Sequence, residues 1–224
     1  MNLMQPFTDP AAVARYATET PRKVPGFADL QRMAMVLLAE HAPPAADILV
    51  LGAGGGLELH AFAAAQPAWR FLGIDPSAEM LDLARRMLAP VGPRIELLQG
   101  YIDDAPLRQF DGATCLLTLH FMSSDERLRT LRELRRRLKP GASLVVAHHS
   151  RPPGGALHRW LSRSLAFAGV AADPERAAAS ATAMAAHLPI LSSDKDEALL
   201  RDAGFSDIEL FYAGFTFRGW VATA

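Results

Sequence analysis

The chain has 224 residues, half of them hydrophobic, which suits one α/β domain with a single sizeable core. Its formal net charge of -1 excludes a whole-molecule field that would hold a polyanion, so we do not expect nucleic acid as a partner. The single cysteine, Cys115, excludes an intrachain disulfide, and no signal-peptide pattern or apolar run near ~20 residues occurs, so we expect a cytoplasmic protein with no membrane partner.

Short apolar runs alternate with helical patterns over residues 47–150, which is typical of βαβ units and a parallel sheet. An amphipathic helix is predicted first, at 27–41. Strands are then predicted at 47–51, 70–74, 95–99, 113–118 and 143–148. Helices are predicted between them at 57–65, 78–88 and 124–138, the last ended by Pro140 and Gly141.

The C-terminal part has helical stretches and then aromatic strands. Residues 151–190 predict two helices split near Asp173 and Pro174. The spacing of Ser193 and Asp196 matches a capping box and predicts a helix over 197–203. Aromatic-rich runs at 208–212 and 215–221, separated by Ala213 and Gly214, predict a closing hairpin, so the sheet is expected to have seven strands, mostly parallel, with an antiparallel C-terminal pair.

The segment most informative about function joins an apolar strand to a glycine-rich turn at Gly52, Gly54 and Gly56. Glycines let the backbone turn tightly and let a nucleoside approach the main chain at the carboxyl end of a strand. The spacing alone also fits a plain strand-to-helix turn. Asp75 ends the second strand about twenty residues later, where it can bind ribose hydroxyls or cap the next helix, a role also open to Ser77.

The spacing of the glycines favours a methyl donor over a dinucleotide. A dinucleotide site needs Gly-x-Gly-x-x-Gly, whereas the third glycine here, Gly56, falls one residue early. The Tyr-x-x-x-Lys pair of short-chain dehydrogenases is also missing. The sequence therefore predicts a Rossmann-like α/β fold, with helices on both faces of the sheet, and favours S-adenosylmethionine over a dinucleotide as its ligand.

Four blocks, at residues 50–56, 73–77, 138–141 and 202–205, resemble the class I S-adenosylmethionine-dependent methyltransferases. The resemblance implies that the glycine loop lies beside the amino-acid moiety of the donor and that Asp75 holds the ribose. Two departures are Val50, where the family often has an acid, and Tyr101, where an Asp is common. The residues expected at the donor are Arg22, Gly52, Ala53, Gly54, Asp75, Pro76, Met80, Tyr101, Ile102, Asp103 and Leu117.

A resemblance over nearly the whole chain is to the carboxy-S-adenosylmethionine synthases of tRNA wobble-uridine modification, through residues 22–27, 118–121 and 203–205. These enzymes use prephenate to carboxylate the donor. Recognition of that carboxylate needs a cation, and the family's arginine is expected in the helix where this chain has Leu199 and Leu200. Unless Arg201 or another arginine substitutes, ordinary methyl transfer is the favoured hypothesis.

Methyl transfer is an in-line displacement, so it needs orientation, a dry pocket and sometimes a base. His120 and His149 follow the fourth and fifth strands on the rim that carries the glycine loop, and with Tyr16 they are the candidate catalytic residues. Each histidine is alternatively a hydrogen-bonded loop residue, and Arg22 a surface arginine. His148 and His149 point to opposite faces of a strand, so no metal site is expected.

The arginines of the helix at 124–138 are interpreted as a solvated face, with a tRNA surface as the alternative. They are Arg129, Arg132, Arg135, Arg136 and Arg137. We expect one domain over 1–224, with N-terminal cap helices at 1–45 and a helical cap at 151–190 over a small-molecule acceptor. A homodimer is expected through the aromatic hairpin or the cap, and a protein that senses the donor without catalysis is a third hypothesis.

Overall fold

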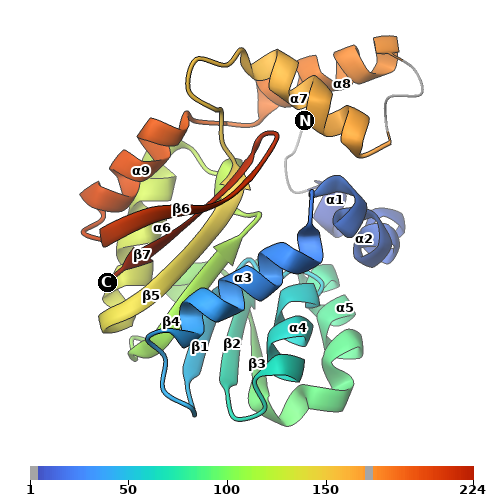
Figure 1. Cartoon of the computed structure of the whole chain (residues 1–224). Helices are drawn as coiled ribbons and strands as arrows, with labels where there is room; N and C mark the ends of the chain where they lie inside the picture. The colour runs from blue at the N-terminus through green and yellow to red at the C-terminus, as the bar shows by residue number, and fades with distance from the viewer. Residues whose placement is uncertain (1–4, 170–173) are drawn as a thin grey trace.

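A mixed sheet with helices on both faces organises the computed structural model, which describes residues 5–169 and 174–224 (Figure 1). Within these residues the strand order is β3-β2-β1-β4-β5-β7-β6. The first five strands are mutually parallel, and the last two form an antiparallel hairpin on β5. The strands are β1 (Asp47–Leu51), β2 (Arg70–Asp75), β3 (Ile95–Gln99), β4 (Phe110–Leu116), β5 (Leu138–His149), β6 (Ser206–Gly214) and β7 (Phe217–Thr223). The predicted sheet is confirmed.

Helices cover both faces of the sheet and its carboxyl edge. The α-helices are α1 (Gln5–Thr8), α2 (Pro10–Lys23), α3 (Phe27–Ala39), α4 (Leu57–Ala65), α5 (Ala78–Leu88), α6 (Ser124–Arg136), α7 (Leu157–Phe167), α8 (Pro174–His187) and α9 (Ser193–Asp202). Short 3-10 helices are η1 (Ala89–Arg94), η2 (Ile102–Asp104) and η3 (Leu119–Phe121). None of the helices in the described ranges has the length and apolar character needed to cross a bilayer.

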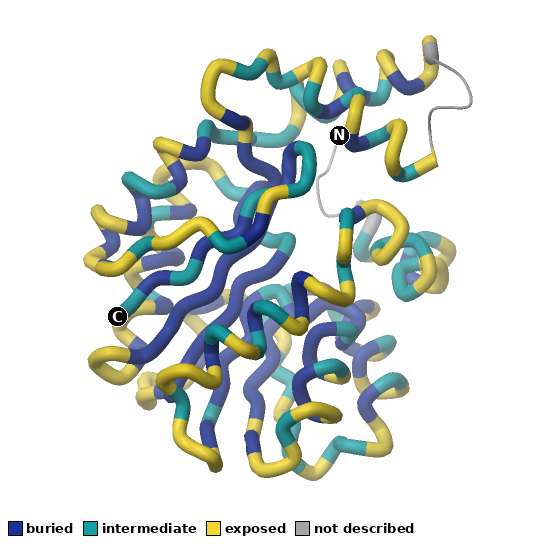
Figure 2. The backbone as a smooth tube through the Cα atoms, in the orientation of Figure 1, coloured by how far each residue is buried: buried dark blue, intermediate teal, exposed yellow. Residues whose placement is uncertain are grey.

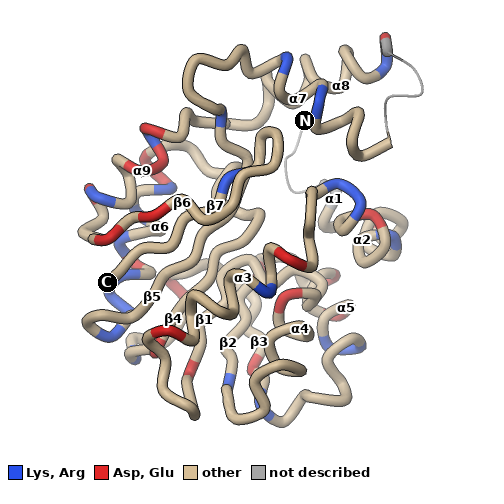
Figure 3. The backbone as a smooth tube through the Cα atoms, in the orientation of Figure 1, with Lys and Arg blue, Asp and Glu red and all other residues tan. Residues whose placement is uncertain are grey.

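Alternation along β1 divides the core into two layers. Leu49 and Leu51 pack with residues of α6 and α9, whereas Ile48 and Val50 pack with residues of α3 and α4. Figure 2 shows the resulting band of buried backbone along the central strands, and Figure 3 shows charged residues mostly on the helices. Because β1 lies between β2 and β4, the strand order reverses there, and the carboxyl ends of β1 and β4 flank a crevice suited to a ligand.

Several predicted boundaries in the central part are wrong. β4 ends at Leu116 instead of residue 118, because Leu117 has a φ of 57° that breaks the extended conformation. Pro140 and Gly141 do not stop α6, which already ends at Arg136. They lie inside β5, which begins earlier than predicted because Leu138 pairs with Phe110 ahead of an irregularity in the ladder.

Two boundaries in the C-terminal part also differ from the prediction. α9 begins at Ser193 after the N-cap Ser192, because Asp196 turns inward instead of closing a capping box. The hairpin turns at Phe215 and Thr216, two residues later than predicted, and Phe215 takes the left-handed conformation with φ 52°. The predicted helix split falls partly at Asp173, outside the described residues.

Arg137 is not part of a solvated face, which corrects the prediction for the arginines of α6. It is 2% exposed, and its guanidinium donates to Ala105 O at 3.0 Å and to Glu133. The C-terminal end of α6 turns this side chain towards the sheet, where it satisfies a buried carbonyl. The other four arginines of the predicted face are exposed.

A buried ionic network joins β5, α6 and α9. Arg127 donates to Asp196 and, at 3.1 Å, to Pro189 O, while His148 Nε2 lies 3.3 Å from Asp196 Oδ1. Burial opposes ionisation of Asp196, but the electrostatic effect of His148 and Arg127 brings its pKa below the ordinary value. The network holds α9 against the sheet and fixes the rotation of this helix, which a hydrophobic contact alone would not do.

We expect Asp196→Asn to lower the free energy of unfolding by about 3–5 kcal/mol, because it leaves the Arg127 charge buried and uncompensated. Chemical denaturation followed by circular dichroism measures the loss. The matched control is Asp103→Asn, which breaks an exposed ion pair with Arg129 and should change the midpoint little. Equal midpoints for the two variants would show that the buried network is not needed for stability.

Candidate functional site

The glycine loop lies at the carboxyl end of β1 and is fixed to β2. Gly52 N donates to Ile74 O at 2.8 Å, and Gly52, Gly54 and Gly56 have φ values of 78°, 51° and 84°. A Cβ at Gly52 would lie 1.9 Å from Thr118 Oγ1, so the turn needs both the conformational freedom of glycine and its small size. The loop is therefore a tight turn pressed against the segment after β4.

Asp75 closes the loop from the end of β2. Its Oδ2 accepts a hydrogen bond from Gly54 N and its Oδ1 accepts one from Ser77 N, both at 2.9 Å. Burial raises the pKa of Asp75, and the two backbone bonds oppose the rise. Ser77 caps α5 by accepting from Met80 N, so Asp75 is not the helix cap, and each carboxylate oxygen retains acceptor capacity for a further donor.

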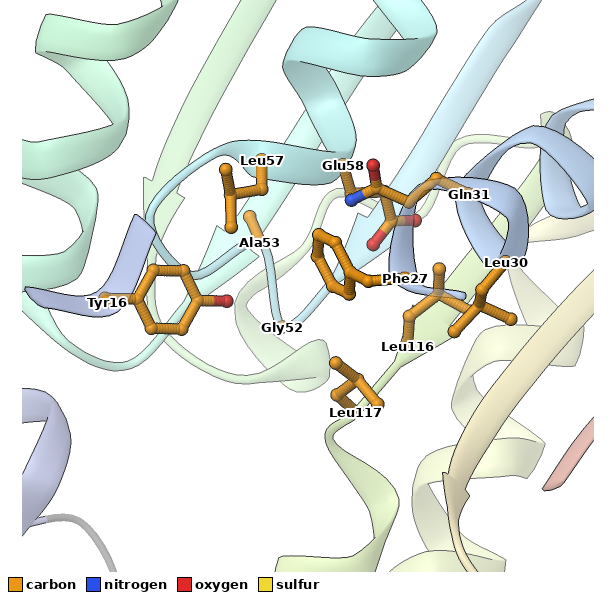
Figure 4. Close-up of a pocket in the computed structure, with 10 residues that line it drawn as sticks. All are labelled: Tyr16, Phe27, Leu30, Gln31, Gly52, Ala53, Leu57, Glu58, Leu116 and Leu117. Atoms are coloured by element: carbon orange, nitrogen blue, oxygen red, sulfur yellow. The ribbon is translucent and has the colours of Figure 1, made fainter. Parts of the chain in front are cut away.

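A small cavity of about 20 Å³ lies over the glycine loop and has room for roughly one water molecule (Figure 4). Its lining comes from α2, α3, the glycine loop, α4 and the end of β4: Tyr16, Phe27, Leu30, Gln31, Gly52, Ala53, Leu57, Glu58, Leu116 and Leu117. Leu117 combines this position with its left-handed φ, a strained conformation for a residue with a side chain. Ligand sites for nucleoside-sized molecules span a few hundred Å³, so this crevice is closed.

Tyr16 of α2 fills the space that a larger ligand would need. Its Oη lies 3.0 Å from the place where a Cβ of Gly54 would stand, and its Cδ1 lies 2.9 Å from the corresponding point at Gly55. Burial raises the pKa of Tyr16, and the carboxylates of Asp75 and Glu58 add to the rise, so the phenol stays neutral. Entry of a nucleoside therefore requires α2 to move off the loop.

Glu58 is a functional candidate that the sequence analysis missed. It lies in the first turn of α4, is 7% exposed, and accepts a hydrogen bond from Thr114 Oγ1 of β4. Burial raises its pKa to about 8, against the lowering effect of the Thr114 bond. One feature of the sequence could have pointed to Glu58: it is an acid in an otherwise apolar helix that directly follows the glycines. No residue of opposite charge lies nearby in the sequence to pair with it.

Residues expected around the adenine lie on different sides of the chain. Met80 is buried with its Cε 3.5 Å from the Cβ position of Gly54, so it does lie against the loop. Tyr101 is 58% exposed beyond β3. The side chain of Ile102 packs in the core, and Asp103 pairs with Arg129 of α6, so neither side chain is free to contact a base in this arrangement.

The remaining donor residues differ in exposure. Pro76, half-buried, links Asp75 to α5, while Arg22 is exposed in the last turn of α2. Arg201 does not supply a cation to the crevice, because it pairs with Glu197 on the exposed side of α9, and Leu199 and Leu200 pack in the core. The lining of the described cavity contains no Lys or Arg.

His149 and His120 meet beneath α7. The two rings are 4.8 Å apart in an edge arrangement, and the His149 ring stacks on Phe217 at 4.0 Å. His149 Nδ1 lies 2.7 Å from Thr216 Oγ1, which in turn lies 2.8 Å from Ser164 Oγ of α7. Thr216 and Ser164 were not predicted from the sequence; they reach this network from the hairpin turn and from the helical segment after β5.

Burial lowers the pKa of both histidines, His149 to about 3 and His120 well below its ordinary value, and the other histidines of the group add to the effect. Both rings are therefore neutral near pH 7, as a proton acceptor or a hydrogen-bonding group requires. His148 faces the opposite side, towards Asp196, as the alternation along β5 predicts. Among the described residues no three His, Cys, Asp or Glu side chains are placed to hold a metal ion.

Gly52→Ala should cost more stability than Gly141→Ala, although both glycines have a φ near 80°. A Cβ at Gly141 meets nothing within 4 Å, so that variant carries only the backbone penalty of about 1–2 kcal/mol. At Gly52 the clash with Thr118 adds ~1–3 kcal/mol. Thermal denaturation of the two variants measures the difference, and equal melting temperatures would contradict the tight packing of the loop.

Unfolding free energy should fall as the pH drops below about 6.5, because the unfolded chain takes up protons that the buried histidines of the folded chain refuse. His149 contributes a slope of about 1.4 kcal/mol per pH unit down to its folded pKa of about 3. The variant His149→Gln should lose this part of the pH dependence, and the exposed control His60→Gln should keep it. Denaturant titrations between pH 7.5 and 4.5 measure both slopes, and parallel curves for wild type and His149→Gln would refute the assignment.

Residues 48–141 match the protein family described as a methyltransferase domain. The carboxy-S-adenosyl-L-methionine synthase of Aeromonas hydrophila is 24% identical over 212 residues, which are 90% of this chain and 83% of that protein. The ubiquinone/menaquinone biosynthesis C-methyltransferase of Syntrophotalea carbinolica is 33% identical over 122 residues, 53% of this chain and 52% of that protein.

The structure of an O-methyltransferase family protein from Burkholderia thailandensis is similar with a TM-score of 0.63 and 18% identity over 93% of this chain, which spans 61% of the length of that structure. The matched family domain contains the glycine loop, Asp75 and the buried Glu58. Residues 48–141 match a methyltransferase domain, and together with the fold around them they support a class I S-adenosylmethionine-dependent methyltransferase.

Proposed function

We propose that the chain transfers the methyl group of S-adenosylmethionine to a small-molecule acceptor. The observation that carries the proposal lies at the carboxyl ends of β1 and β2. There the Asp75 carboxylate accepts hydrogen bonds from Gly54 N and Ser77 N next to the glycine loop. A carboxylate with spare acceptor capacity suits a ribose, and a backbone that a Cβ would obstruct suits close approach of the attached amino-acid part. The residues present therefore fit the donor once Tyr16 withdraws.

Each side chain has a specific task in this proposal. Asp75 accepts from the ribose hydroxyls, Met80 provides an apolar surface for the base, and the backbone of Tyr101 to Asp103 flanks it. Gly52, Ala53, Gly54 and Leu117 border the amino-acid end, Pro76 orients α5, and Arg22 is the proposed partner of the donor carboxylate. The donor supplies a methyl group on a sulfonium, which leaves the protein to align it with the acceptor and to exclude water.

The acceptor side of the proposal is the polar group under α7. His149, held through Thr216 and Ser164, and the neighbouring His120 are neutral hydrogen-bonding groups that can orient an acceptor or receive its proton. Tyr16 completes the proposed catalytic set from the donor side. In this proposal the chain is one domain over 1–224, with residues 1–45 closing over the donor and residues 151–190 closing over the acceptor.

A carboxymethyl-forming activity is the second candidate, and the likeness to the Aeromonas hydrophila synthase over 90% of the chain favours it. The charge of the crevice opposes it. Its lining has no Lys or Arg, so a second carboxylate on the donor would find no cation to pair with there. Incubation with S-adenosylmethionine and prephenate, followed by mass analysis of the nucleoside product, separates the two activities.

We also propose that the protein is located in the cytoplasm and forms a homodimer. One buried thiol, Cys115, suits a reducing compartment. An apolar groove beside β6, lined by Met33, Met35, Val36, Leu37, Phe211, Asp29 and Arg32, supports self-association, and light scattering measures it.

Mass spectrometry of the small molecule released on denaturing freshly purified protein tests the function directly. S-adenosylmethionine or S-adenosylhomocysteine is the expected result. A carboxylated donor would establish the second candidate instead, and a dinucleotide would contradict the donor assignment altogether.

Asp75→Ala should weaken binding of S-adenosylhomocysteine by roughly 100-fold, because two charge-assisted hydrogen bonds to the ribose are lost. Isothermal titration calorimetry measures the affinity. The matched control is Asp82→Ala, which removes an exposed acid of α5 that pairs with Arg85 and should leave the affinity unchanged. A wild-type affinity for Asp75→Ala would disprove the ribose assignment.

A further inference from the structure

We infer that Glu58 is the carboxylate that pairs with the α-ammonium group of the donor, a role that rests on the proposed function. The family resemblance places an acid two residues before the first glycine, and this chain has Val50 there, buried in the core and uncharged. Glu58 brings an acid to the same crevice from the other end of the glycine loop, through the first turn of α4.

The position of Glu58 relative to Asp75 indicates on which side of Asp75 the charged end of the donor lies. Asp75 ends β2, whose neighbours are β3 on one side and β1 on the other. Tyr101, which follows β3, offers an aromatic surface on that side for an uncharged base, whereas the side chain of Met80 lies against Gly54 of the loop. The β1 side leads to the closed cavity, where Glu58 lies with Gly52 and Ala53 (Figure 4). A nucleoside held at Asp75 therefore has its charged substituent directed to the side that carries the acid.

The cavity contains nothing else that would neutralise Glu58. Its other polar side chains are those of Tyr16 and Gln31, both uncharged, and none of the lining residues is a Lys or Arg. Thr114 donates to Oε1 and holds the carboxyl group in a fixed orientation on α4. A carboxyl group that is buried, oriented and without a cation is prepared for a cationic ligand, because ionisation becomes favourable only when that ligand arrives.

Donor binding is consequently linked to release of a proton from Glu58. The titratable groups facing it are the phenol of Tyr16 on α2 and the thiol of Cys115 on β4. Both have raised pKa values and stay neutral. Glu58 itself has a pKa of about 8 without the ammonium, so most of it is protonated at pH 7. Affinity for a donor with an ammonium should rise as the pH increases towards 8, by up to tenfold per pH unit, and then level off.

The test is calorimetry of wild type and Glu58→Gln at pH 7, in two buffers with different ionisation enthalpies. Three probes separate the charges: S-adenosylmethionine, S-adenosylhomocysteine, which keeps the ammonium without the sulfonium, and methylthioadenosine, which has neither. We expect wild type to release close to one proton with the first two probes and none with the third. Glu58→Gln should release none and bind the first two roughly 10- to 100-fold more weakly, with methylthioadenosine unchanged.

Glu96→Gln, the same substitution at an exposed position of β3, is the matched control and should behave as wild type. Equal weakening of all three probes in Glu58→Gln would overturn the inference, because it would show a general structural effect. Weakening of S-adenosylmethionine alone would also overturn it, because the sulfonium and not the ammonium would then be the partner. If wild type binds none of the three nucleosides, the proposed function itself fails, which is a different result from a silent Glu58→Gln.

Discussion

The pair of hydrogen bonds from Gly54 N and Ser77 N to the Asp75 carboxylate is the constraint on which the site depends. It joins the turn after β1 to the start of α5 through the last residue of β2. Without it the glycine loop, which has left-handed φ values at three positions, would lose the contact that selects one conformation from many. The same carboxylate therefore clamps the loop, and in the proposed function it also accepts hydrogen bonds from the ribose.

Elements governed by local signals could be predicted from the sequence. Helices α4 and α5 have the predicted bounds because a glycine turn and the Ser77 cap start them, and β1 and β3 are short apolar runs bounded by turns. Asp75 was identifiable for the same reason, since strand, acid and helix cap are adjacent in the chain. In each of these places one stretch of sequence contains the whole reason for the structure.

Features that depend on distant segments were not predictable in this way. Glu58 is meaningful only beside Thr114, 56 residues away, and Thr216 reaches His149 across 67 residues. Arg137 turns inward because it donates to the carbonyl of Ala105, and the helical periodicity of the sequence does not predict this distant contact. The placement of Tyr16 over the loop is likewise set by how α2 packs on α5 and α3, and the pattern of its own helix does not encode it.

The packing of Tyr16 on the glycine loop has a consequence for the affinity and the rate of donor binding. A site that is occupied by its own chain presents to the donor only the fraction of molecules in which α2 has swung away, so the observed affinity is the intrinsic affinity scaled by that fraction. In the proposed function, association of the donor therefore includes a step in which α2 moves. Because α2 also contacts α7, the proposed donor and acceptor sites share a helix contact, so binding of an acceptor under α7 would change the affinity for the donor.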